Sequence, residues 1–220
     1  MKKQLLIFDL DGTLVDSSAD LTTGINLMRA HYNQSPLERE TVTGYIGDGV
    51  RKLVERSLQG LDVDVDEALA LDKQFYAEHM LDETQLYPGV EEGLKLLAGN
   101  ELAVLSNKPG DPTRSILKHL GADGLFFRML GGGDLPSLKP APDGLEALMA
   151  ESGISAENTW MIGDHHTDLE VAHNAGVKSG FVTYGIGHAG EFTADQTWHG
   201  FQELTDFFMG EPRMSANERK

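Results

Sequence analysis

The chain has no cysteine among its 220 residues. Disulfide bonds, thiolate nucleophiles and cysteine-ligated metal centres are therefore excluded, and the composition suits a reducing compartment. Long hydrophobic runs are also missing, because the apolar stretch near the N-terminus is short and is followed at once by Asp9. Such a stretch is too short for a signal peptide or a membrane span. We therefore expect a cytoplasmic protein without a membrane partner.

Positive charge is scarce as well. The chain carries 18 lysines and arginines against 35 aspartates and glutamates, which gives a formal net charge of -17. Long-range repulsion of that size excludes nucleic acid and anionic membrane surfaces as partners. A small phosphorylated metabolite remains compatible, since it needs only local positive charge from a metal, a lysine or a helix N-terminus. The length allows one sizeable core, or one core with a small accessory domain. We expect the chain to be a monomer or a homodimer.

The most informative segment covers residues 5–13 and reads Leu-Leu-Ile-Phe-Asp-Leu-Asp-Gly-Thr. Its apolar run is typical of a strand buried on both faces of a parallel sheet. Asp9 and Asp11 follow directly, and buried carboxylates must be paired or bind a metal. Gly12 lets the backbone turn, and Thr13 offers a hydroxyl and an amide to an anion. An ordinary turn is the alternative, because Asp and Gly are common turn residues.

Strand and helix patterns alternate along the chain except in one long helical segment, residues 17–85, which has no strand signal. The later strands are expected at 102–105, 127–130, 159–162 and 179–183, and the later helices near 90–97, 111–120, 143–152 and 167–175. In the helical segment, helices are expected around Leu21 to Tyr32, Val50 to Leu58 and Val65 to Met80. The segment 211–220 is polar and is expected to be a disordered tail.

This alternation predicts an α/β fold: a doubly wound, mainly parallel, Rossmann-like sheet with an inserted all-helical cap. Residues 1–16 and 86–210 form the expected catalytic core, and residues 17–85 form the expected cap. The two linkers, near residues 14–17 and 85–89, place the hinge of the cap just past the two carboxylates. A lid in that position can exclude water from a site at the sheet edge.

Three further polar signals follow predicted strands. Ser106 and Asn107 come after the second strand, Lys139 precedes a pair of prolines, and Asp164 ends the strand 159–162 with Asp168 four residues later. Each signal alone has an ordinary explanation, such as a loop, an exposed lysine or a helix cap. Because the carboxyl ends of parallel strands meet at one sheet edge, the joint pattern indicates a single site.

These groups suit phosphoryl transfer through an aspartyl phosphate. A carboxylate can attack phosphorus and divide one difficult hydrolysis into two easier steps. Mg²⁺ prefers oxygen ligands and would neutralise the repulsion between that carboxylate and the phosphate. Ser106 and Thr13 can donate hydrogen bonds to the transferred oxygens, and Lys139 can balance their charge. Asp11 is the candidate to protonate the leaving alkoxide and later to activate water.

The order Asp9-x-Asp11-Gly-Thr, then Ser106, Lys139 and Gly-Asp164-x-x-x-Asp168, resembles the haloacid dehalogenase superfamily over nearly the whole chain. The resemblance implies that Asp9 is the nucleophile and that Asp11 is the general acid and base. It also implies Mg²⁺ bound by Asp9, the main-chain carbonyl of Asp11 and Asp164, with Asp168 in support. Gly12, Thr13, Ser106, Asn107 and Lys139 are the expected phosphate-binding residues.

Within the superfamily the chain is most similar to the phosphoglycolate phosphatases. The resemblance is carried by residues 47–56 of the cap, Tyr-Pro-Gly-Val at 87–90 and Ser-Asn-Lys-Pro at 106–109. It implies hydrolysis of a small phosphorylated acid, and 2-phosphoglycolate is our best prediction. Arg51 is the candidate for its carboxylate, since guanidinium pairs with carboxylate through two hydrogen bonds; the alternative is an exposed helix charge.

Other interpretations remain open at this point. A phosphosugar mutase or a sugar-phosphate phosphatase of the same superfamily shares the nucleophile, the acid and the cap. A receiver-like binding module is a more distant alternative, because the acid pair and a lid exceed what it needs. The adjacent His165 and His166 depart from the usual family pattern. They could bind a metal, but Mg²⁺ prefers oxygen, which favours loop histidines without a ligand role.

Overall fold

The computed structural model describes residues 2–210 and centres on a six-stranded sheet. The strand order is β5-β4-β1-β6-β7-β8, and every neighbouring pair is parallel. The strands are β1 (Leu5–Phe8), β4 (Glu101–Pro109), β5 (Arg128–Gly132), β6 (Thr159–Gly163), β7 (Lys178–Val182) and β8 (Gln196–Trp198). The predicted doubly wound, mainly parallel α/β sheet is confirmed. Its central strand β1 is fully buried, as its apolar sequence requires.

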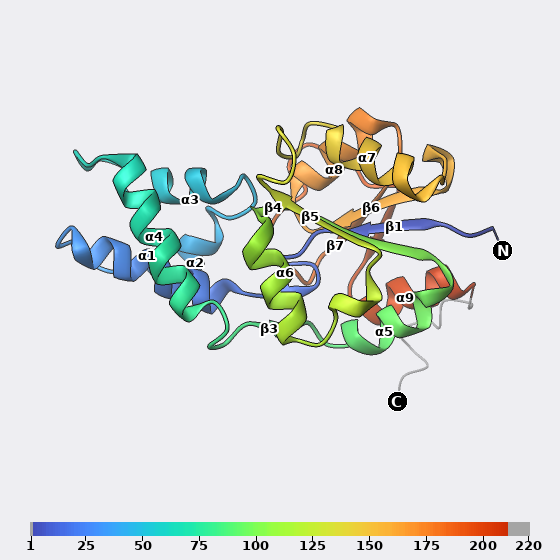
Figure 1. Ribbon diagram of the computed structural model, residues 1–220, viewed down its shortest axis with the longest axis horizontal. Coiled ribbons are helices and arrows are strands. Elements are labelled where there is room, and N and C mark those ends of the chain that lie inside the picture. The colour runs from blue at the N-terminus through green and yellow to red at the C-terminus, as the bar shows by residue number, and fades with distance from the viewer. Residues whose placement is uncertain (1, 211–220) are drawn as a thin grey trace.

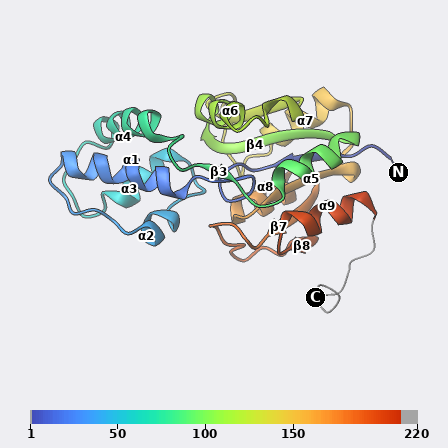
Figure 2. The ribbon, with the colours of Figure 1, turned by 90° about the horizontal axis from the view of Figure 1, so that it is seen from below.

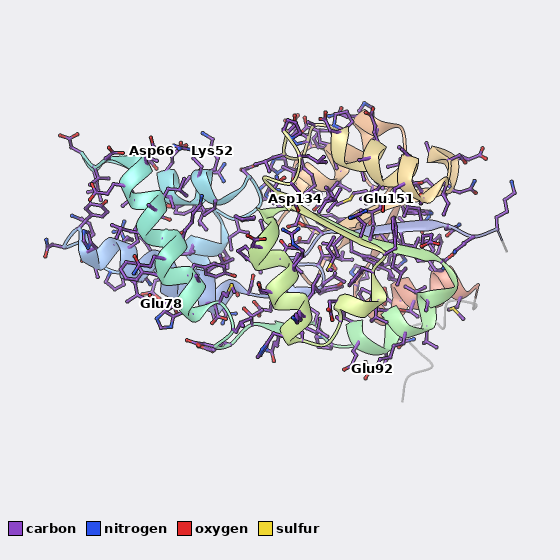
Figure 3. The ribbon with its side chains drawn as sticks, in the orientation of Figure 1. Lys52, Asp66, Glu78, Glu92, Asp134 and Glu151 are labelled. Carbon is purple, nitrogen blue, oxygen red and sulfur yellow. The ribbon has the colours of Figure 1, made fainter. Side chains whose placement is uncertain are left out.

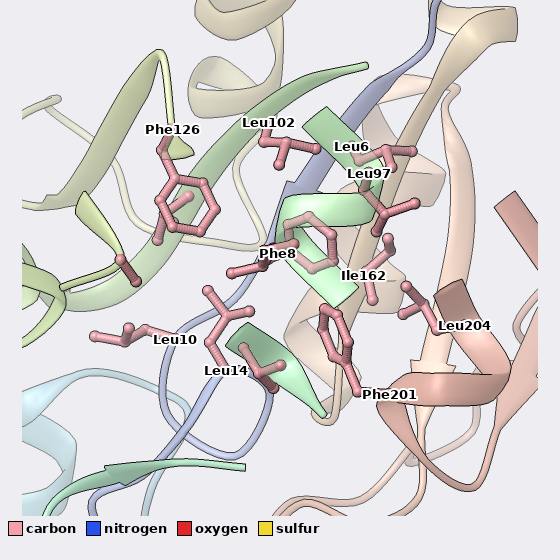
Figure 4. Close-up of a cluster of buried hydrophobic side chains, with 14 of the residues drawn as sticks. Leu6, Phe8, Leu10, Leu14, Leu97, Leu102, Phe126, Ile162, Phe201 and Leu204 are labelled. Carbon is pink, nitrogen blue, oxygen red and sulfur yellow. The ribbon is translucent and has the colours of Figure 1, made fainter. Parts of the chain in front are cut away.

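Helices cover both faces of this sheet (Figure 1). Leu6 and Phe8 of β1 pack in the cluster formed with α5 (Val90–Leu96), α6 (Gly110–His119) and α9 (Phe201–Met209) (Figure 4). Leu5 and Ile7 point to the opposite face and pack against α7 (Asp143–Ser152) and α8 (His166–Ala175). The period-two alternation of a strand thus builds two hydrophobic cores from one apolar run. Short 3₁₀ helices lie at Leu97–Gly99, Asp123–Leu125 and Ala156–Asn158.

Four helices between β2 and β3 form a separate helical lobe at the left of Figure 1, which Figure 2 shows from below. They are α1 (Ser18–His31), α2 (Arg39–Thr43), α3 (Val50–Ser57) and α4 (Val65–His79). Buried apolar side chains of this lobe, among them Ile25, Val54 and Tyr76, form a hydrophobic cluster of their own. We call this lobe the cap. Its helices follow from the 3.6-residue spacing of those apolar positions.

The two connections between the cap and the sheet pair with each other. β2 (Val15–Asp16) and β3 (Gln85–Leu86) form a two-stranded antiparallel ribbon. Next to it, the buried Asp20 carboxylate accepts the backbone N–H groups of Glu83 and Thr84 at 2.9–3.1 Å. The segments expected to be linkers are therefore hydrogen-bonded to each other, through the β2–β3 pairing and through the Asp20 carboxylate.

Several elements differ from the sequence-based expectations. β4 continues to Pro109 instead of ending at Ser106, because Pro109 still pairs with Gly132 of β5 across an irregularity in the register. The short elements α2 and β8 were not predicted, and neither was α9, although Phe201, Leu204 and Phe208 have helical spacing. The expected tail 211–220 lies outside the described residues. No helix among residues 2–210 is long and apolar enough to cross a membrane.

Candidate active site

Three carboxylates meet at the carboxyl edge of the sheet. Asp9 follows β1, Asp164 follows β6 and Asp168 lies in the first turn of α8; one oxygen from each lies within 4.8 Å of the others. All three side chains are buried. Parallel pairing of β1 with β6 brings these acids together. Asp9 lies one residue past the end of β1, and its N–H still donates to the carbonyl of Ile162 in β6 at 2.9 Å. The structure thus brings together the acids that the sequence analysis assigned to one edge of the sheet.

Lys139 supplies the opposite charge inside this cluster. Its Nζ lies 3.0 Å from Oδ1 of Asp9 and 2.6 Å from Oδ1 of Asp168. Burial alone would lower the pKa of Lys139, but the attraction of Asp168 and Asp9 outweighs it and raises that pKa. The side chain is therefore a fixed cation. It holds the two carboxylates in place and compensates part of their charge.

Asn107 positions the lysine. Its side-chain oxygen accepts the N–H of Lys139 at 2.8 Å, while its amide nitrogen donates to the carbonyl oxygens of Lys139 and Gly47, both at 3.0 Å. Both amide hydrogens are thus used within the protein. The expectation that Asn107 binds the substrate is not supported by this arrangement. Its side chain joins the lysine loop of the core to the Gly47 loop of the cap.

The chain around Asp164 is built so that its carboxylate cannot rotate freely. Oδ2 accepts the backbone N–H groups of Ile186 and Gly187 at 2.9 and 2.8 Å, and Oδ1 accepts the Thr13 hydroxyl at 3.2 Å. Gly12 has a φ of +82°, and a Cβ on it would lie 2.0 Å from Oδ2 of Asp164. Only glycine fits there, because the backbone and the carboxylate touch.

Gly12 and Thr13 therefore act differently from the sequence-based expectation. The N–H of Gly12 donates to the carbonyl of Val15, and the N–H of Thr13 donates to that of Leu10. The Thr13 hydroxyl is directed to Asp164, and neither residue lines the cavity described below. Both were expected to bind phosphate. The structure instead uses them to shape the turn and to support Asp164.

Burial and mutual repulsion shift the carboxylates strongly. Burial, opposed by Lys139 and reinforced by Asp168, raises the pKa of Asp9 to about 6. Burial, followed by the negative charges of Asp168 and Asp9, raises the pKa of Asp164 to about 8. One lysine does not neutralise three buried acids, so the cluster has a deficit of positive charge. Its oxygen donors suit a hard divalent cation such as Mg²⁺, and the residues present fit that ion.

Asp11 has separate partners. Lys108 Nζ lies 3.1 Å from both of its carboxylate oxygens, and the Ser17 hydroxyl donates to Oδ1. The ammonium of Lys108 is buried and also stands 4.5 Å above the ring of Tyr76 from the cap. Burial alone would lower the pKa of Lys108, but Asp11 and Tyr76 raise it. Asp11 is thus held at the cavity by a permanent cation.

A cavity of about 470 Å³ opens between the cap and the sheet edge. The core side of its wall includes Asp9, Asp11, Ser106, Asn107, Lys108, Asp164 and His165. The cap side includes Leu21, Ile46, Gly47, Leu53, Asp72, Lys73 and Tyr76. Burial raises the pKa of Asp72 to about 7, against the opposing effects of Lys108 and Lys73. The cap therefore covers the acidic cluster and contributes both apolar and charged groups to the wall.

Arg51 is not brought to this cavity. It pairs with Asp66 on the cap, its side chain is 52% exposed, and it is absent from the residues that line the cavity. Figure 3 shows Asp66 at the outer edge of the cap. The first turn of α3 turns Arg51 outward because Val50, Leu53 and Val54 form the inward stripe. The interpretation of Arg51 as a substrate contact is thus replaced by an exposed ion pair.

Sequence reasoning missed Lys108, Tyr76 and Asp72 as residues of this site. Lys108 stood in the phrase Ser-Asn-Lys-Pro but was not assigned a role. Tyr76 lies four residues after Asp72 on α4, so both share one helix face, and that spacing was the available signal. A carboxylate on an otherwise apolar helix stripe indicates a partner or a cavity.

The two histidines after Asp164 are not loop residues. His165 is the N-cap of α8, is buried, and accepts the N–H of Thr167 through its side chain. Its own N–H donates to Asp168 at 3.0 Å, which completes a capping arrangement. Burial, with the nearby His166, lowers the pKa of His165 to about 4. The expectation of loop histidines is therefore corrected for both, since His166 is the first residue of α8.

Comparison with known proteins places this geometry in a family. The model of the haloacid dehalogenase-like hydrolases matches residues 6–182. Phosphoglycolate phosphatase of Colwellia psychrerythraea is 37% identical over 197 residues, which cover 85% of this chain and 87% of that protein. Phosphoglycolate phosphatase 1 of Pseudomonas aeruginosa is 40% identical over 196 residues, or 84% of this chain and 71% of that protein.

A solved structure shares the arrangement of most of the chain. The crystal structure described as a predicted phosphoglycolate phosphatase from Haemophilus somnus superposes with a TM-score of 0.88 at 30% identity. The superposition covers 94% of this chain and 99% of that one. The sequence match, the shared fold and the acidic cluster at the sheet edge agree. The chain therefore belongs to the haloacid dehalogenase-like hydrolase family.

Proposed function

We propose that the chain is a Mg²⁺-dependent phosphomonoesterase that acts on 2-phosphoglycolate through a phosphorylated Asp9. One observation carries this proposal: the Asp9 carboxylate faces a cap-covered cavity, 3.0 Å from the fixed cation Lys139, with the carboxylate of Asp11 lining the same cavity. A nucleophile, a second acid and a water-excluding lid are what hydrolysis through an acyl phosphate requires. The names of the relatives support the substrate.

The first step is attack by the Asp9 carboxylate on phosphorus, with cleavage of the bond from phosphorus to the ester oxygen. Lys139 lowers the pKa of Asp9 and so keeps the nucleophile ionised near neutral pH. The Ser106 hydroxyl forms a hydrogen bond with Asp9 that acts in the same direction, and it lines the cavity, where it can donate to a transferred oxygen. Hydrogen bonds to a charged group contribute about 1.5–3 kcal/mol each.

Asp11 carries the proton in both steps. Its protonated carboxyl gives a proton to the leaving alkoxide, and the resulting carboxylate then takes one from the water that attacks phosphorylated Asp9. In the structure the Lys108 ammonium contacts both side-chain oxygens of Asp11 at 3.1 Å. An anionic substrate competes for the Lys108 ammonium, and we propose that this competition allows Asp11 to take up its proton. The second step releases phosphate and restores Asp9.

The residues that would hold Mg²⁺ are Asp9, Asp164 and the main-chain carbonyl of Asp11, with Asp168 in support. The ion, when bound, supplies the positive charge that the three buried acids lack and offsets repulsion between Asp9 and the phosphate dianion. Support for this assignment comes from the raised pKa values of Asp9 and Asp164, which show that ionising both carboxylates is unfavourable without further positive charge.

Lys108 is the proposed contact for the substrate's carboxylate. In 2-phosphoglycolate a single carbon separates the leaving oxygen from the carboxylate, so the two lie close together. Asp11 must reach the leaving oxygen, and Lys108 contacts Asp11 at 3.1 Å. Arg114 also lines the cavity, but it is paired with Asp111 and Asp134. The Lys108 ammonium contacts both oxygens of Asp11 in the structure, and we propose that the substrate's carboxylate takes over part of this contact, which is the competition described above.

Phosphate release over a panel of phosphomonoesters tests the reaction. The purified chain should hydrolyse 2-phosphoglycolate faster than hexose phosphates, lose activity on chelation and regain it with Mg²⁺. Asp9→Asn should abolish turnover and leave the circular dichroism spectrum unchanged. Full activity of Asp9→Asn would overturn the mechanism. A preference for hexose phosphates would show instead that the chain is a sugar-phosphate phosphatase, and isomerisation of a hexose phosphate would show that it is a mutase.

A second comparison separates the two proposed tasks of Lys108. The ratio of kcat/KM for 2-phosphoglycolate to that for ethyl phosphate, which lacks the carboxylate, should fall about 10- to 100-fold in Lys108→Met. Lys73→Met removes a cavity-lining lysine of the cap and serves as the matched control, with an unchanged ratio. If kcat/KM falls equally on both esters in Lys108→Met, Lys108 does not contact the substrate's carboxylate and only supports Asp11.

A further inference from the structure

Three histidines meet beside the proposed catalytic cluster without taking part in it. His165 and His166 begin α8, and His188 comes from the segment between β7 and β8. One ring nitrogen of each lies within 4.8 Å of the others. The ring centroids of His165 and His166 are 4.1 Å apart, and those of His166 and His188 are 5.4 Å apart, with the rings nearly parallel. The proposed phosphoryl transfer uses none of them.

Hydrogen bonding does not account for this cluster. His165 Nδ1 accepts from Thr167, which leaves its Nε2 for another partner. His166 Nδ1 is buried and has no hydrogen-bond partner among residues 2–210. His166 Nε2 lies 3.8 Å from Oδ1 of Asp48, a distance too long for a hydrogen bond. Buried polar atoms of a folded protein are normally satisfied, so His166 Nδ1 indicates a ligand.

We propose that His165, His166 and His188 bind one divalent transition-metal ion of the Zn²⁺ class, with His166 binding through Nδ1 and Asp48 of the cap facing its other ring nitrogen, Nε2. Such ions take three imidazoles and a water in a tetrahedron, with bonds to nitrogen of about 2.0–2.1 Å that place neighbouring ligand atoms about 3.3 Å apart. The imidazole nitrogens lie within 4.8 Å of one another, and small rotations of the rings bring them to that spacing. Metal-binding histidines commonly donate their second ring N–H to a carboxylate. Asp48 Oδ1 can accept the Nε2–H of His166 in this way, because Arg56 contacts its other oxygen, Oδ2.

This donor set selects an ion different from that of the acidic cluster. Imidazole suits Zn²⁺, Ni²⁺ and Cu²⁺, whereas the all-oxygen set of Asp9, Asp164 and Asp168 suits Mg²⁺. The two sets are neighbours in sequence and in space, since His165 follows Asp164 directly. A single segment, residues 163–168, thereby serves two sites of different chemistry.

The proposed metal site joins the cap to the core. The three histidines belong to the core, while Asp48 lies in the Gly47–Gly49 loop of the cap, which also lines the cavity. Gly47 packs directly against the His165 ring. A Cβ on Gly47 would lie only 2.5 Å from that ring. An ion bound to the three histidines fixes His165 against Gly47 and His166 against Asp48, and so holds the cap closed. The ion therefore inhibits turnover by slowing exchange of substrate and product. The binding itself is independent of the proposed function, and only the inhibition rests on it.

Metal binding should be measured on the full chain with Mg²⁺ in excess, so that the acidic cluster is occupied. Calorimetric titration with Zn²⁺ should give one site per chain, and Co²⁺ should produce the visible absorption of a tetrahedral complex. His166→Ala and His188→Ala should weaken Zn²⁺ affinity at least about 10-fold. His79→Ala is the matched control, because this histidine lies on the cap and pairs with Asp82; its Zn²⁺ affinity should equal that of the wild type.

Two variants distinguish the proposed site from its neighbour. Asp164→Asn should keep Zn²⁺ binding, whereas loss in that variant but not in the histidine variants would assign the ion to the acidic cluster and overturn the proposal. Absence of Zn²⁺ binding by the wild type would overturn it as well. Asp48→Ala should retain Zn²⁺ through the three histidines but lose most of the inhibition of phosphate release. Unchanged inhibition in Asp48→Ala would refute the bridge between cap and core.

Discussion

A methyl group at Gly12 should disable the site by moving Asp164. Gly12 has a φ of +82°, and a Cβ there would lie 2.0 Å from Oδ2 of Asp164, whereas real Cβ atoms essentially never approach closer than 3.0 Å. The carboxylate would therefore move by about 1 Å. The same oxygen accepts two backbone N–H groups, from Ile186 and Gly187, so the shift also disturbs a pair of charge-assisted hydrogen bonds.

Gly60 provides a matched control in the cap. Its φ of +85° is nearly that of Gly12, but a Cβ on it would meet nothing within 4 Å. Gly60→Ala should therefore report only the left-handed backbone strain, about 1–2 kcal/mol of unfolding free energy. Gly12→Ala adds overpacking of about 1–3 kcal/mol. We expect a total loss of about 2–5 kcal/mol at Gly12 against about 1–2 kcal/mol at Gly60.

The measurements are urea unfolding at neutral pH, Mg²⁺ affinity by calorimetry and phosphate release. Gly12→Ala should lower kcat/KM about 100-fold, the effect expected of a 1 Å displacement, and weaken Mg²⁺ binding about 10-fold or more. Gly60→Ala should leave both values near those of the wild type. The reasoning is refuted if the two variants lose the same unfolding free energy and Gly12→Ala retains its activity and its affinity for Mg²⁺.

Three further predictions follow from the electrostatics. Because the folded-state pKa values of Asp9 and Asp164 are raised from 3.8 to about 6 and about 8, the metal-free protein loses stability as the pH rises through those values. Added Mg²⁺ should therefore raise the Tm more at about pH 8.5 than at about pH 6; an equal gain at both would contradict this charge deficit. Asp72 has a pKa of about 7 in the folded protein, so its ionisation costs stability as the pH rises. Between about pH 5 and about pH 8 the wild type should therefore lose a few kcal/mol of unfolding free energy relative to Asp72→Asn, at about 1.4 kcal/mol per pKa unit. A constant difference in urea unfolding would show that Asp72 ionises freely. Arg51→Ala should change unfolding free energy by less than about 0.5 kcal/mol and leave kcat/KM on 2-phosphoglycolate unaltered. A selective fall of kcat/KM on that ester would show that Arg51 contacts the substrate.

The sequence by itself determined the sheet and the place of its site. Three of the predicted buried strands, 5–8, 102–105 and 159–162, are each followed within two residues by a polar side chain: Asp9, Ser106 and Asp164. Parallel pairing then requires those ends to share one edge, so Asp9, Asp164 and Ser106 could be assigned to one site without coordinates. The helical spacing between residues 17 and 85 likewise identified the cap.

Tertiary structure alone decided which polar atoms are free. Gly12, Thr13 and Asn107 have the right chemistry for phosphate, yet their donors are used by Val15, Leu10, Asp164, Lys139 and Gly47. A residue type states what a side chain can donate. Which acceptor that donor already contacts depends on packing, because the acceptor often comes from a distant part of the chain.

The same reason explains the errors in the cap and at the start of α8. Arg51, Asp72 and Tyr76 all lie on helices of the cap, but which helix face turns to the sheet depends on how α1, α3 and α4 pack on one another. His165 and His166 are a local pair in sequence, while His188 and Asp48 reach them from separate segments. Periodicity fixes the face of a helix, and long-range packing fixes what that face meets.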